Sequence, residues 1–452
     1  MKRLLSHYKS TLSLGIPVIL AQMGQISVGI VDNMMIGHVG TQELAAASFA
    51  NTIFGLTLIF GMGFSFIFTP LIGEAFGQQQ HQRIGLLLKN GLVSSLLVGL
   101  GMISLLLVTS LMMDRMGQPM EIVPASRSYL LILTSTVLPM MLFYTFKQFA
   151  EGIGDTRTSM VVMLVANVVN VIGNYIFING YLGMPEMGLM GAGIGTVMAR
   201  ITMMVGAIGC FVYRNHMKVF VTPFKQAQVI VSELKEMAKM GIPLGAQTVM
   251  EASAFGLSTV MMGWTGAVGL AAHQVAISIS TLGFMIYQGI GAATTIRISF
   301  LRGKLDFEGI KDASIASIHI TMGLVLILAS FFLITSNWLP TLYTDDHSVI
   351  MLASSFMLVL AAYQLPDAMQ IILASMLRAM SDVKIPAVIT FISYFIISLP
   401  AGYLMTFQLG VGEIGIWYGF PIGLTICSTL FIFRFLFVLK EKRKKTVAQY
   451  QL

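Results

Sequence analysis

Hydrophobic runs long enough to cross a lipid bilayer dominate this chain. A bilayer core is spanned by about 20 apolar residues, and polar or charged residues separate twelve apolar stretches of roughly this length. The twelve stretches are residues 12–36, 48–74, 86–113, 122–149, 159–179, 188–213, 241–264, 275–300, 314–338, 348–378, 385–407 and 414–439. We therefore predict an all-α polytopic membrane protein with twelve transmembrane helices.

The composition supports this class. Of the 452 residues, 56% are hydrophobic and 10% charged, and the mean hydropathy is +0.82, whereas soluble domains carry about 25% charged residues. The first stretch follows Lys2, Arg3 and Lys9 and has no evident cleavage site, which is typical of a retained helix rather than a signal peptide. The two cysteines, Cys210 and Cys427, lie in apolar runs and exclude a disulfide framework.

The basic residues predict the orientation in the membrane. Lys and Arg gather before the first stretch, after each even-numbered stretch and at the C-terminus, whereas the alternate connections hold only Arg115. Cytoplasmic loops carry such an excess, so we expect both termini in the cytoplasm. Since the net charge of +7 is spread over short loops, the chain lacks the basic patch of a nucleic-acid partner.

The chain also repeats itself. Gly-Ile-Pro occurs at residues 15–17 and again at 241–243, and Gly63 falls on Gly289 at the same offset. Six helices separate the copies, so the two halves share one orientation, as parallel repeats do in some secondary transporters. We predict three segments, which are an N-terminal six-helix lobe over residues 1–213, a cytoplasmic linker over 214–240 and a C-terminal six-helix lobe over 241–452.

Acids inside the apolar stretches are the first candidates for function. Glu251 is the only ionisable side chain in stretch 241–264, and an acid at a helix centre costs about 2.5–3.5 kcal/mol on insertion scales. A helical rise of 1.5 Å places both Glu251 and Asp367 about 15–16 Å from the cytoplasmic helix ends. Tyr363 precedes Asp367 by one turn, so its hydroxyl could complete an oxygen cage or relay a proton. The alternative is a protonated, purely structural glutamic acid.

The first half holds a second polar group. Asp32 lies about 26 Å along its helix, and Asn174 rises to a similar depth in the fifth stretch. Asn170 precedes Asn174 by one turn, and Thr196 lies at a comparable depth in the sixth stretch. Asn and Thr in membrane helices commonly join helices by hydrogen bonds, so a structural role and an ion-binding role both remain open.

Other polar residues are expected to be structural. Arg200 lies inside the sixth stretch and needs a partner that the sequence does not identify. Glu74 and Glu151 lie near cytoplasmic helix ends, where we expect solvated positions, and Asp155 is expected to be a turn residue. No His-Glu-x-x-His helix and no phosphate-binding loop is present, so we predict a protein that is not an enzyme and has no ATPase of its own.

Several segments together resemble one transporter family. They are Gly29-Ile-Val-Asp32, Glu151-Gly-Ile-Gly-Asp-Thr-Arg157, Asn170-x3-Asn174-Tyr-Ile-Phe, Met250-Glu251, Val268-Gly-Leu-Ala-Ala-His-Gln-Val275, Gly289-Ile-Gly-Ala-Ala and Tyr363-Gln-Leu-Pro-Asp367. Over its whole length the chain resembles the multidrug and toxic compound extrusion (MATE) family, in particular its NorM-like branch. Asn174 departs from some other branches, which carry an acid there.

The resemblance implies a V-shaped, two-lobe exporter of cationic, lipophilic drugs and dyes, coupled to Na⁺ or H⁺ and without another cofactor. It implies cation binding by Glu251 and Asp367, which could hold Na⁺, and proton or cation binding by Asp32, Asn170, Asn174 and Thr196. It also implies a bacterial cytoplasmic (inner) membrane location, where we expect a monomer among membrane lipids. The alternatives are a lipid-linked saccharide flippase, which would need buried basic residues for a pyrophosphate, and a non-transporting receptor or scaffold.

Overall fold

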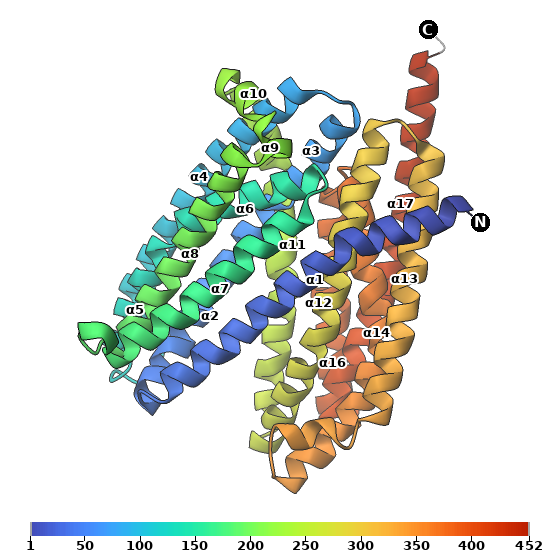
Figure 1. The fold of residues 1–452 in the computed structure, drawn as a ribbon. Helices are drawn as coiled ribbons and strands as arrows, with labels where there is room; N and C mark the ends of the chain where they lie inside the picture. The colour runs from blue at the N-terminus through green and yellow to red at the C-terminus, as the bar shows by residue number, and fades with distance from the viewer. Residues whose placement is uncertain (1, 451–452) are drawn as a thin grey trace. The chain divides into compact units, whose positions relative to one another are not determined.

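The computed structural model describes the backbone of residues 2–450 and the side chains of residues 3–444, and almost all of this part is helical (Figure 1). No strand occurs in the described backbone, which confirms the predicted all-α fold. The side chains of Lys2 and Lys445, which belong to the predicted charge bias, lie outside the described residues. The chain divides into two compact units, which we call the first-repeat unit (residues 20–245) and the second-repeat unit (residues 1–19 and 246–452).

The first-repeat unit is drawn mainly in blue to green in Figure 1. It contains the later part of α1 (Lys2–Gly37) and the early part of α11 (Val231–Gly263). Between them lie α2 (Thr41–Ser65), α3 (Phe68–Gly77), α4 (His81–Met112), α5 (Val123–Ser135), α6 (Val137–Gly152), α7 (Thr156–Asn179), α8 (Gly188–Tyr213), α9 (Asn215–Lys218) and α10 (Val221–Gln226), with short 3₁₀ turns at Met113–Arg115 and Tyr181–Gly183.

The second-repeat unit is built around α12, α14 and α17, which pack on one another. Its helices after α11 are α12 (Ala267–Gly303), α13 (Phe307–Ile334), α14 (His347–Ala379), α15 (Lys384–Phe391), α16 (Leu399–Tyr403) and α17 (Ile414–Tyr450), with a 3₁₀ turn at Leu339–Leu342. Two π-helical segments, Ile392–Ser398 and Leu404–Gln408, flank α16. Pro400 in α16 cannot donate a backbone hydrogen bond, which accounts for irregular turns at this position.

Eleven helical segments of the described chain are long and apolar enough to cross a membrane. The twelfth predicted stretch, 241–264, is the later part of α11 and does not meet this criterion. Gln247, Thr248, Glu251 and Ser253 make this segment more polar than the other eleven. The most polar long helix is therefore the one that carries the predicted coupling acid.

Two helices each belong partly to both units. The first 19 residues, which begin α1, pack with the second-repeat unit, and the part of α11 before Ala246 packs with the first-repeat unit. Arg297 Nη1 donates to His7 O at 2.6 Å, and Arg3 pairs with Asp312 at 2.7 Å. The units therefore differ from the predicted segments 1–213, 214–240 and 241–452, which follow the repeat rather than the contacts.

Glycines allow the first segments of α1 and α11 to pack closely against helices of the units they join. A Cβ on Gly289 of α12 would collide with Ile19 of α1, and a Cβ on Gly241 of α11 would collide with the ring of Phe64 in α2. Because a side chain larger than hydrogen would push these helices apart, glycine is required where each exchanged segment meets its unit.

The linker between the repeats is held along the first-repeat unit. The buried Asn90 of α4 donates to Gln228 O at 3.0 Å and accepts from Ile230 N at 2.8 Å. Lys89 Nζ donates to Ala227 O at 2.6 Å, and Arg83 forms a double contact with Glu233 at 2.6 and 3.0 Å. Side chains from one helix thus satisfy the exposed backbone between α10 and α11.

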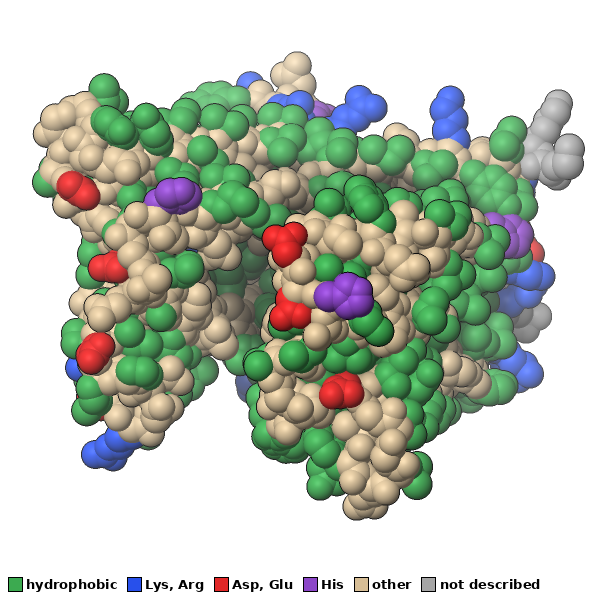
Figure 2. All heavy atoms as spheres, turned by 90° about the horizontal axis from the view of Figure 1, so that it is seen from below, with side chains coloured by type: hydrophobic (Ala, Val, Ile, Leu, Met, Phe, Trp, Pro, Cys, Tyr) green, Lys and Arg blue, Asp and Glu red, His purple; other side chains and the backbone are tan. Residues whose placement is uncertain are grey.

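The surface has the character of a membrane protein. Large hydrophobic side chains stay exposed on several helices, among them Leu105, Leu111 and Ile334. In the end-on view of Figure 2, hydrophobic side chains cover much of the visible surface, and the acidic side chains stand apart from one another. Arg127, near the start of α5, pairs with Asp114 at 2.6 Å, so a second basic residue besides Arg115 lies at this connection.

Candidate functional site

Glu251 lies in the later part of α11, in the second-repeat unit, and is half-buried. Its Oε1 atom accepts two hydrogen bonds of 3.0 Å each, from Gln247 Nε2 and from Gln370 Nε2. Gln247 precedes Glu251 by one turn of α11, so helical geometry alone brings these two side chains together. Gln370 comes from α14. Two neutral amides therefore donate to this carboxylate, and Arg378 of α14 also interacts with it electrostatically.

Asp367 lies in α14 of the same unit and is only 2% exposed. Its Oδ2 has no hydrogen-bond partner among the described residues, and its charge interacts electrostatically with that of Glu251. The hydroxyl of Tyr363, one turn earlier, lies 2.9 Å from Ser280 Oγ of α12 and also interacts with Asp367. Glu251, Asp367 and Tyr363 thus belong to one cluster within the second-repeat unit.

Aromatic and amide side chains enclose this cluster. The ring of the fully buried Trp417 lies edge-on to Tyr363 with 6.5 Å between ring centroids. Tyr287 donates its hydroxyl hydrogen to Gln364 Oε1 at 2.9 Å. Burial among such rings lowers the local dielectric constant, so a charge here acts more strongly on its neighbours than it would in water.

The first-half residues form a separate cluster inside the first-repeat unit. Asn174 Nδ2 of α7 donates to Asp32 Oδ1 of α1 at 2.6 Å. A Cβ on Gly195 of α8 would collide with Asn174 Oδ1, so glycine lets the two helices approach. Asn170 is buried with its Oδ1 unpartnered among the described residues, whereas Thr196 donates to Ala192 O of its own helix at 3.0 Å. Thr196 therefore bonds within its own helix α8.

Arg200, which had no identified partner in the sequence, is held by three neighbours in this unit. One of its Nη atoms donates to Thr136 Oγ1, and its guanidinium lies 4.6 Å from the ring centroid of Phe54. It also interacts electrostatically with Asp32. Arg200 is thus a positively charged member of the first-half cluster. The sequence alone did not place it there.

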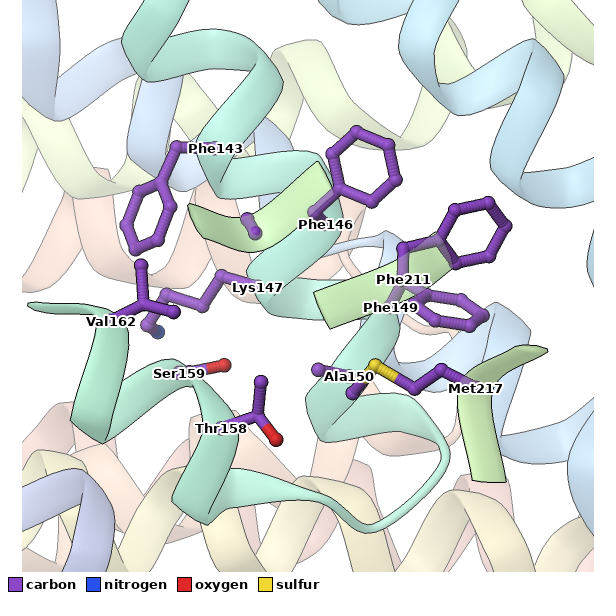
Figure 3. Close-up of a pocket in the computed structure, with 11 residues that line it drawn as sticks. Phe143, Phe146, Lys147, Phe149, Ala150, Thr158, Ser159, Val162, Phe211 and Met217 are labelled. Atoms are coloured by element: carbon purple, nitrogen blue, oxygen red, sulfur yellow. The ribbon is translucent and has the colours of Figure 1, made fainter. Parts of the chain in front are cut away.

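Glu151 is not solvated as expected. It is 2% exposed and pairs with Lys147 at 2.7 Å, one turn earlier in α6. The prediction failed because depth along the helix does not reveal which face is covered. A small cavity lies beside this pair (Figure 3). It is lined by Phe143, Phe146, Lys147, Phe149, Ala150, Thr158, Ser159, Val162, Ala207, Phe211 and Met217. None of the predicted site residues lines it.

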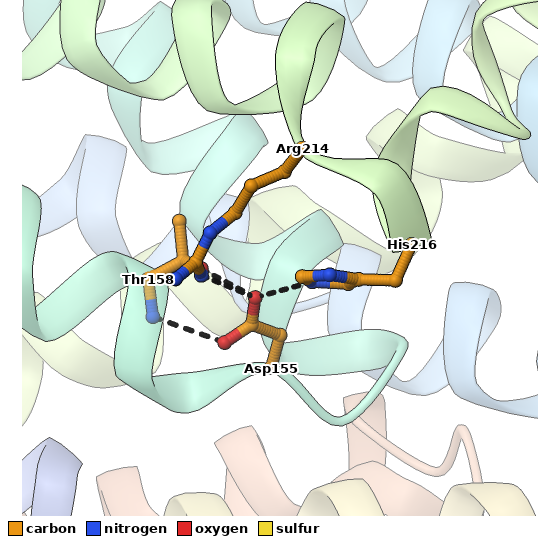
Figure 4. A network of polar contacts seen from close by, with 4 residues as sticks. All are labelled: Asp155, Thr158, Arg214 and His216. Atoms are coloured by element: carbon orange, nitrogen blue, oxygen red, sulfur yellow. Dashed lines mark hydrogen bonds and ion pairs between the residues drawn. The ribbon is translucent and has the colours of Figure 1, made fainter.

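Asp155 caps the start of α7 and organises a polar network at the end of this unit (Figure 4). Its Oδ1 accepts from Thr158 N at 3.0 Å, and its Oδ2 contacts Arg214 at 3.1 Å and His216 at 2.6 Å. Burial raises the pKa of Asp155, but the hydrogen bonds from Thr158 and His216 and the charge of Arg214 outweigh burial. The pKa therefore lies below its ordinary value, and the carboxylate is a structural anion.

The structure adds cluster members that sequence reasoning missed, namely Gln247, Gln370, Gln364, Ser280 and Tyr287. The spacing from Glu251 could have indicated Gln247, and the three-residue spacing from Asp367 could have indicated Gln370. Ser280 and Tyr287 come from another helix, and nothing local connects them with the acids. Among the described residues, no group of three His, Cys, Asp or Glu side chains converges as a metal site would.

Comparison with known proteins places these observations in a family. The MatE family model matches residues 17–176 and 243–404, so that both matched segments begin at the corresponding prolines Pro17 and Pro243. A probable multidrug resistance protein NorM of Agrobacterium fabrum is 30% identical over 97% of this chain and 96% of its own length. The multidrug resistance protein NorM of Photobacterium profundum is 29% identical over 94% of each chain.

Solved structures agree on the fold. A crystal structure of MATE in the bent conformation has a TM-score of 0.89 at 18% identity and covers 99% of each chain. An outward-facing multidrug resistance MATE family transporter has a TM-score of 0.86 over 97% of each chain. The two matched segments confirm the predicted duplication. The chain therefore belongs to the MatE family and is a NorM-like multidrug efflux transporter of the membrane.

Proposed function

We propose that this transporter is an antiporter that exchanges Na⁺ or H⁺ for cationic, lipophilic compounds. One observation carries the proposal: two acids, Glu251 and Asp367, share a buried cluster and interact with each other, and the hydrogen bonds to Glu251 come from neutral amides. A cluster of this kind attracts cations. The names of the NorM relatives do not state the charge of the drugs. We choose cationic drugs because two acids would bind a positively charged substrate.

Competition for negative charge would couple the two movements. Two carboxylates brought together in a low-dielectric interior repel each other, and a proton, Na⁺ or an organic cation relieves that repulsion. If drug and ion favour different conformations, the binding of one promotes release of the other, and the ion gradient drives export. The two acids titrate as one coupled unit.

A lipid-linked saccharide flippase is less well supported. Its pyrophosphate substrate would need several basic side chains in the translocation region. Arg200 is a cation in the first-half cluster, but its guanidinium is already engaged by Thr136, Phe54 and Asp32. The acids of the second-half cluster would repel an anionic headgroup.

Removing either acid tests the proposal. We expect Glu251→Gln and Asp367→Asn each to lower ion-driven export of a fluorescent organic cation from proteoliposomes at least about ten-fold, because each removes one charge of the pair. Export is measured with a Na⁺ gradient alone and with a pH gradient alone, which identifies the coupling ion. Glu236→Gln is the matched control, since Glu236 is an exposed acid in the same helix.

Two results would contradict the proposal. One is wild-type export by both acid variants at equal protein density. The other is a wild-type protein that exports the cation at the same rate with and without either gradient, which would leave a transporter without ion coupling.

A further inference from the structure

The two glutamines at Glu251 meet on a single oxygen. Gln247 and Gln370 come from different helices, and both direct an amide hydrogen to Glu251 Oε1 at 3.0 Å. Both glutamines are buried, at 3% and 1% exposure. Burying two amides is unfavourable unless they are hydrogen-bonded. The hydrogen bonds to Glu251 therefore stabilise the two buried amides as well as the carboxylate.

A neutral donor has an effect that a basic partner would not have. Arg378, a basic residue in the same helix as Gln370, interacts electrostatically with Glu251 and offsets part of its charge. The two amides instead stabilise the carboxylate by hydrogen bonds to a charged group and add no further positive charge. Glu251 is thus both stabilised and still attractive to a cation.

A glutamine amide can also present its carbonyl oxygen as an acceptor or ligand. Turning it by half a revolution replaces the N–H donors with a carbonyl oxygen. Hard cations take carboxylate and amide carbonyl oxygens as ligands. Because only two acids take part in this cluster and no third His, Cys, Asp or Glu converges with them in the described chain, neutral oxygens are needed to complete a coordination shell.

We propose that Gln247 and Gln370 form an amide clamp that donates to Glu251 when no cation is bound and turns its carbonyl oxygens to the bound cation. The inference rests on the proposed ion coupling. With Na⁺ the carbonyl oxygens are ligands, and with H⁺ they accept the hydrogen of the protonated Glu251. The clamp allows the site to release its ion without leaving a bare buried carboxylate.

The fluorescence of a tryptophan beside the cluster can report ion binding. Trp417 is buried beside Tyr363, whereas the other two tryptophans, Trp264 and Trp338, are exposed. In a Trp264→Phe, Trp338→Phe background of the full-length protein, Trp417 fluorescence reports ion binding at the cluster. The protein is titrated with Na⁺ at fixed pH, and with acid in a buffer that contains no Na⁺.

We expect Gln247→Met and Gln370→Met each to raise the half-saturating Na⁺ concentration about ten-fold, because the loss of a carbonyl ligand to the bound cation outweighs the loss of a hydrogen bond to the empty carboxylate. Methionine keeps the length of the side chain but offers neither amide hydrogen nor carbonyl oxygen. Gln148→Met is the matched control, because Gln148 is equally buried in the first-repeat unit and bonds to Thr69. Gln370→Glu keeps an oxygen ligand and should retain Na⁺ binding, which a packing role would not explain.

The outcomes separate the two proposals. Methionine variants that fold and bind Na⁺ like the wild type overturn the clamp and leave ion coupling intact. If only acid changes the fluorescence, the same variants must move the midpoint of the acid titration, and an unmoved midpoint overturns the clamp. A wild-type protein that responds to neither Na⁺ nor acid overturns the clamp and the ion coupling together. If Gln370→Met does not fold, Gln247→Met and Gln370→Glu decide.

Discussion

Glu151 and Glu251 are both acids within helices, but they have different neighbours. Lys147 lies 2.7 Å from Glu151 and supplies a permanent positive charge one turn away. Glu251 has Gln247 and Gln370 instead. A buried ion pair is strongly destabilised when one partner is removed, which suits a structural contact. Glu251 accepts its hydrogen bonds from neutral amides and shares the single charge of Arg378 with a second nearby acid, Asp367, which suits exchange between different cations.

Asp155 allows a test of a purely structural acid. We expect Asp155→Asn to lower stability by up to about 1 kcal/mol at neutral pH, because asparagine can still cap the helix but loses the ionic contacts with Arg214 and His216. The pKa of folded Asp155 lies below its ordinary value of 3.8, so the ionised carboxyl stabilises the fold above that value and loses this contribution as pH falls through the folded-state pKa. The difference in Tm between wild type and variant should therefore begin to shrink as pH falls below 3.8 and disappear only below the folded-state pKa of Asp155.

This measurement uses thermal unfolding in detergent over a series of pH values. A difference in Tm that stays constant down to the lowest pH at which the protein remains folded would show that the charge of Asp155 contributes nothing. Transport activity should change little, because none of the contacts of Asp155 reaches the clusters around Glu251 and Asp32.

At the scale of helices, α1 and α11 occupy equivalent places in the duplication. The units change over between Ile19 and Leu20 in α1 and between Gly245 and Ala246 in α11, shortly after Pro17 and Pro243. Proline removes a backbone hydrogen bond and bends a helix. Each half of the molecule therefore contributes the beginning of its first helix to the unit formed by the other half.

The glycine contacts of these exchanged segments lead to a prediction at the same scale. We expect Gly241→Val and Gly289→Val each to destabilise the protein by about 1–3 kcal/mol, the usual cost of overpacking, because the added side chains would meet Phe64 and Ile19. Gly256→Val is the control, since a Cβ on Gly256 has no neighbour within 4 Å. Tm measured by thermal unfolding distinguishes them, and equal losses at all three positions would refute the role of close contact.

At the scale of the whole molecule, duplication has produced two units with different polar clusters. The second-repeat unit carries Glu251 and Asp367, whereas the first-repeat unit pairs Asp32 with Asn174 and also contains the cation Arg200. In each unit an arginine interacts electrostatically with an acid, Arg378 with Glu251 and Arg200 with Asp32, but the second-repeat cluster contains one acid more, Asp367. We therefore assign the stronger cation attraction to the second-repeat unit.

The orientation of the chain is a prediction that belongs to the whole molecule. With Cys210 and Cys427 replaced by alanine, we expect a membrane-impermeant maleimide to label Asp345→Cys in intact cells and Arg443→Cys only after the membrane is opened. Asp345 and Arg443 are both exposed. The physical reason is the retention of basic loops on the cytoplasmic side. The reverse labelling pattern would invert the predicted topology.

Much of the fold was predictable because it depends on local pattern. The length of each apolar run determines a membrane helix, and a constant rise per residue determines that Glu251 and Asp367 reach similar depth. The prediction failed or stayed incomplete where a residue's surroundings mattered. Glu151 was expected in solvent and is buried, and Arg200 had no assigned partner until Thr136 and Phe54 were placed beside it.

By itself the sequence determined an all-helical, duplicated membrane protein with two acids at matching depth, because run length, repeat and helical rise are properties of the chain alone. Only the tertiary structure decided that Gln370 completes the surroundings of Glu251, that Ser280 reaches Tyr363, and that α1 and α11 exchange their first segments. These contacts join positions far apart in the chain. They depend on which helix faces pack together, and the hydrophobic pattern of a membrane helix, apolar on nearly every side, does not encode that choice.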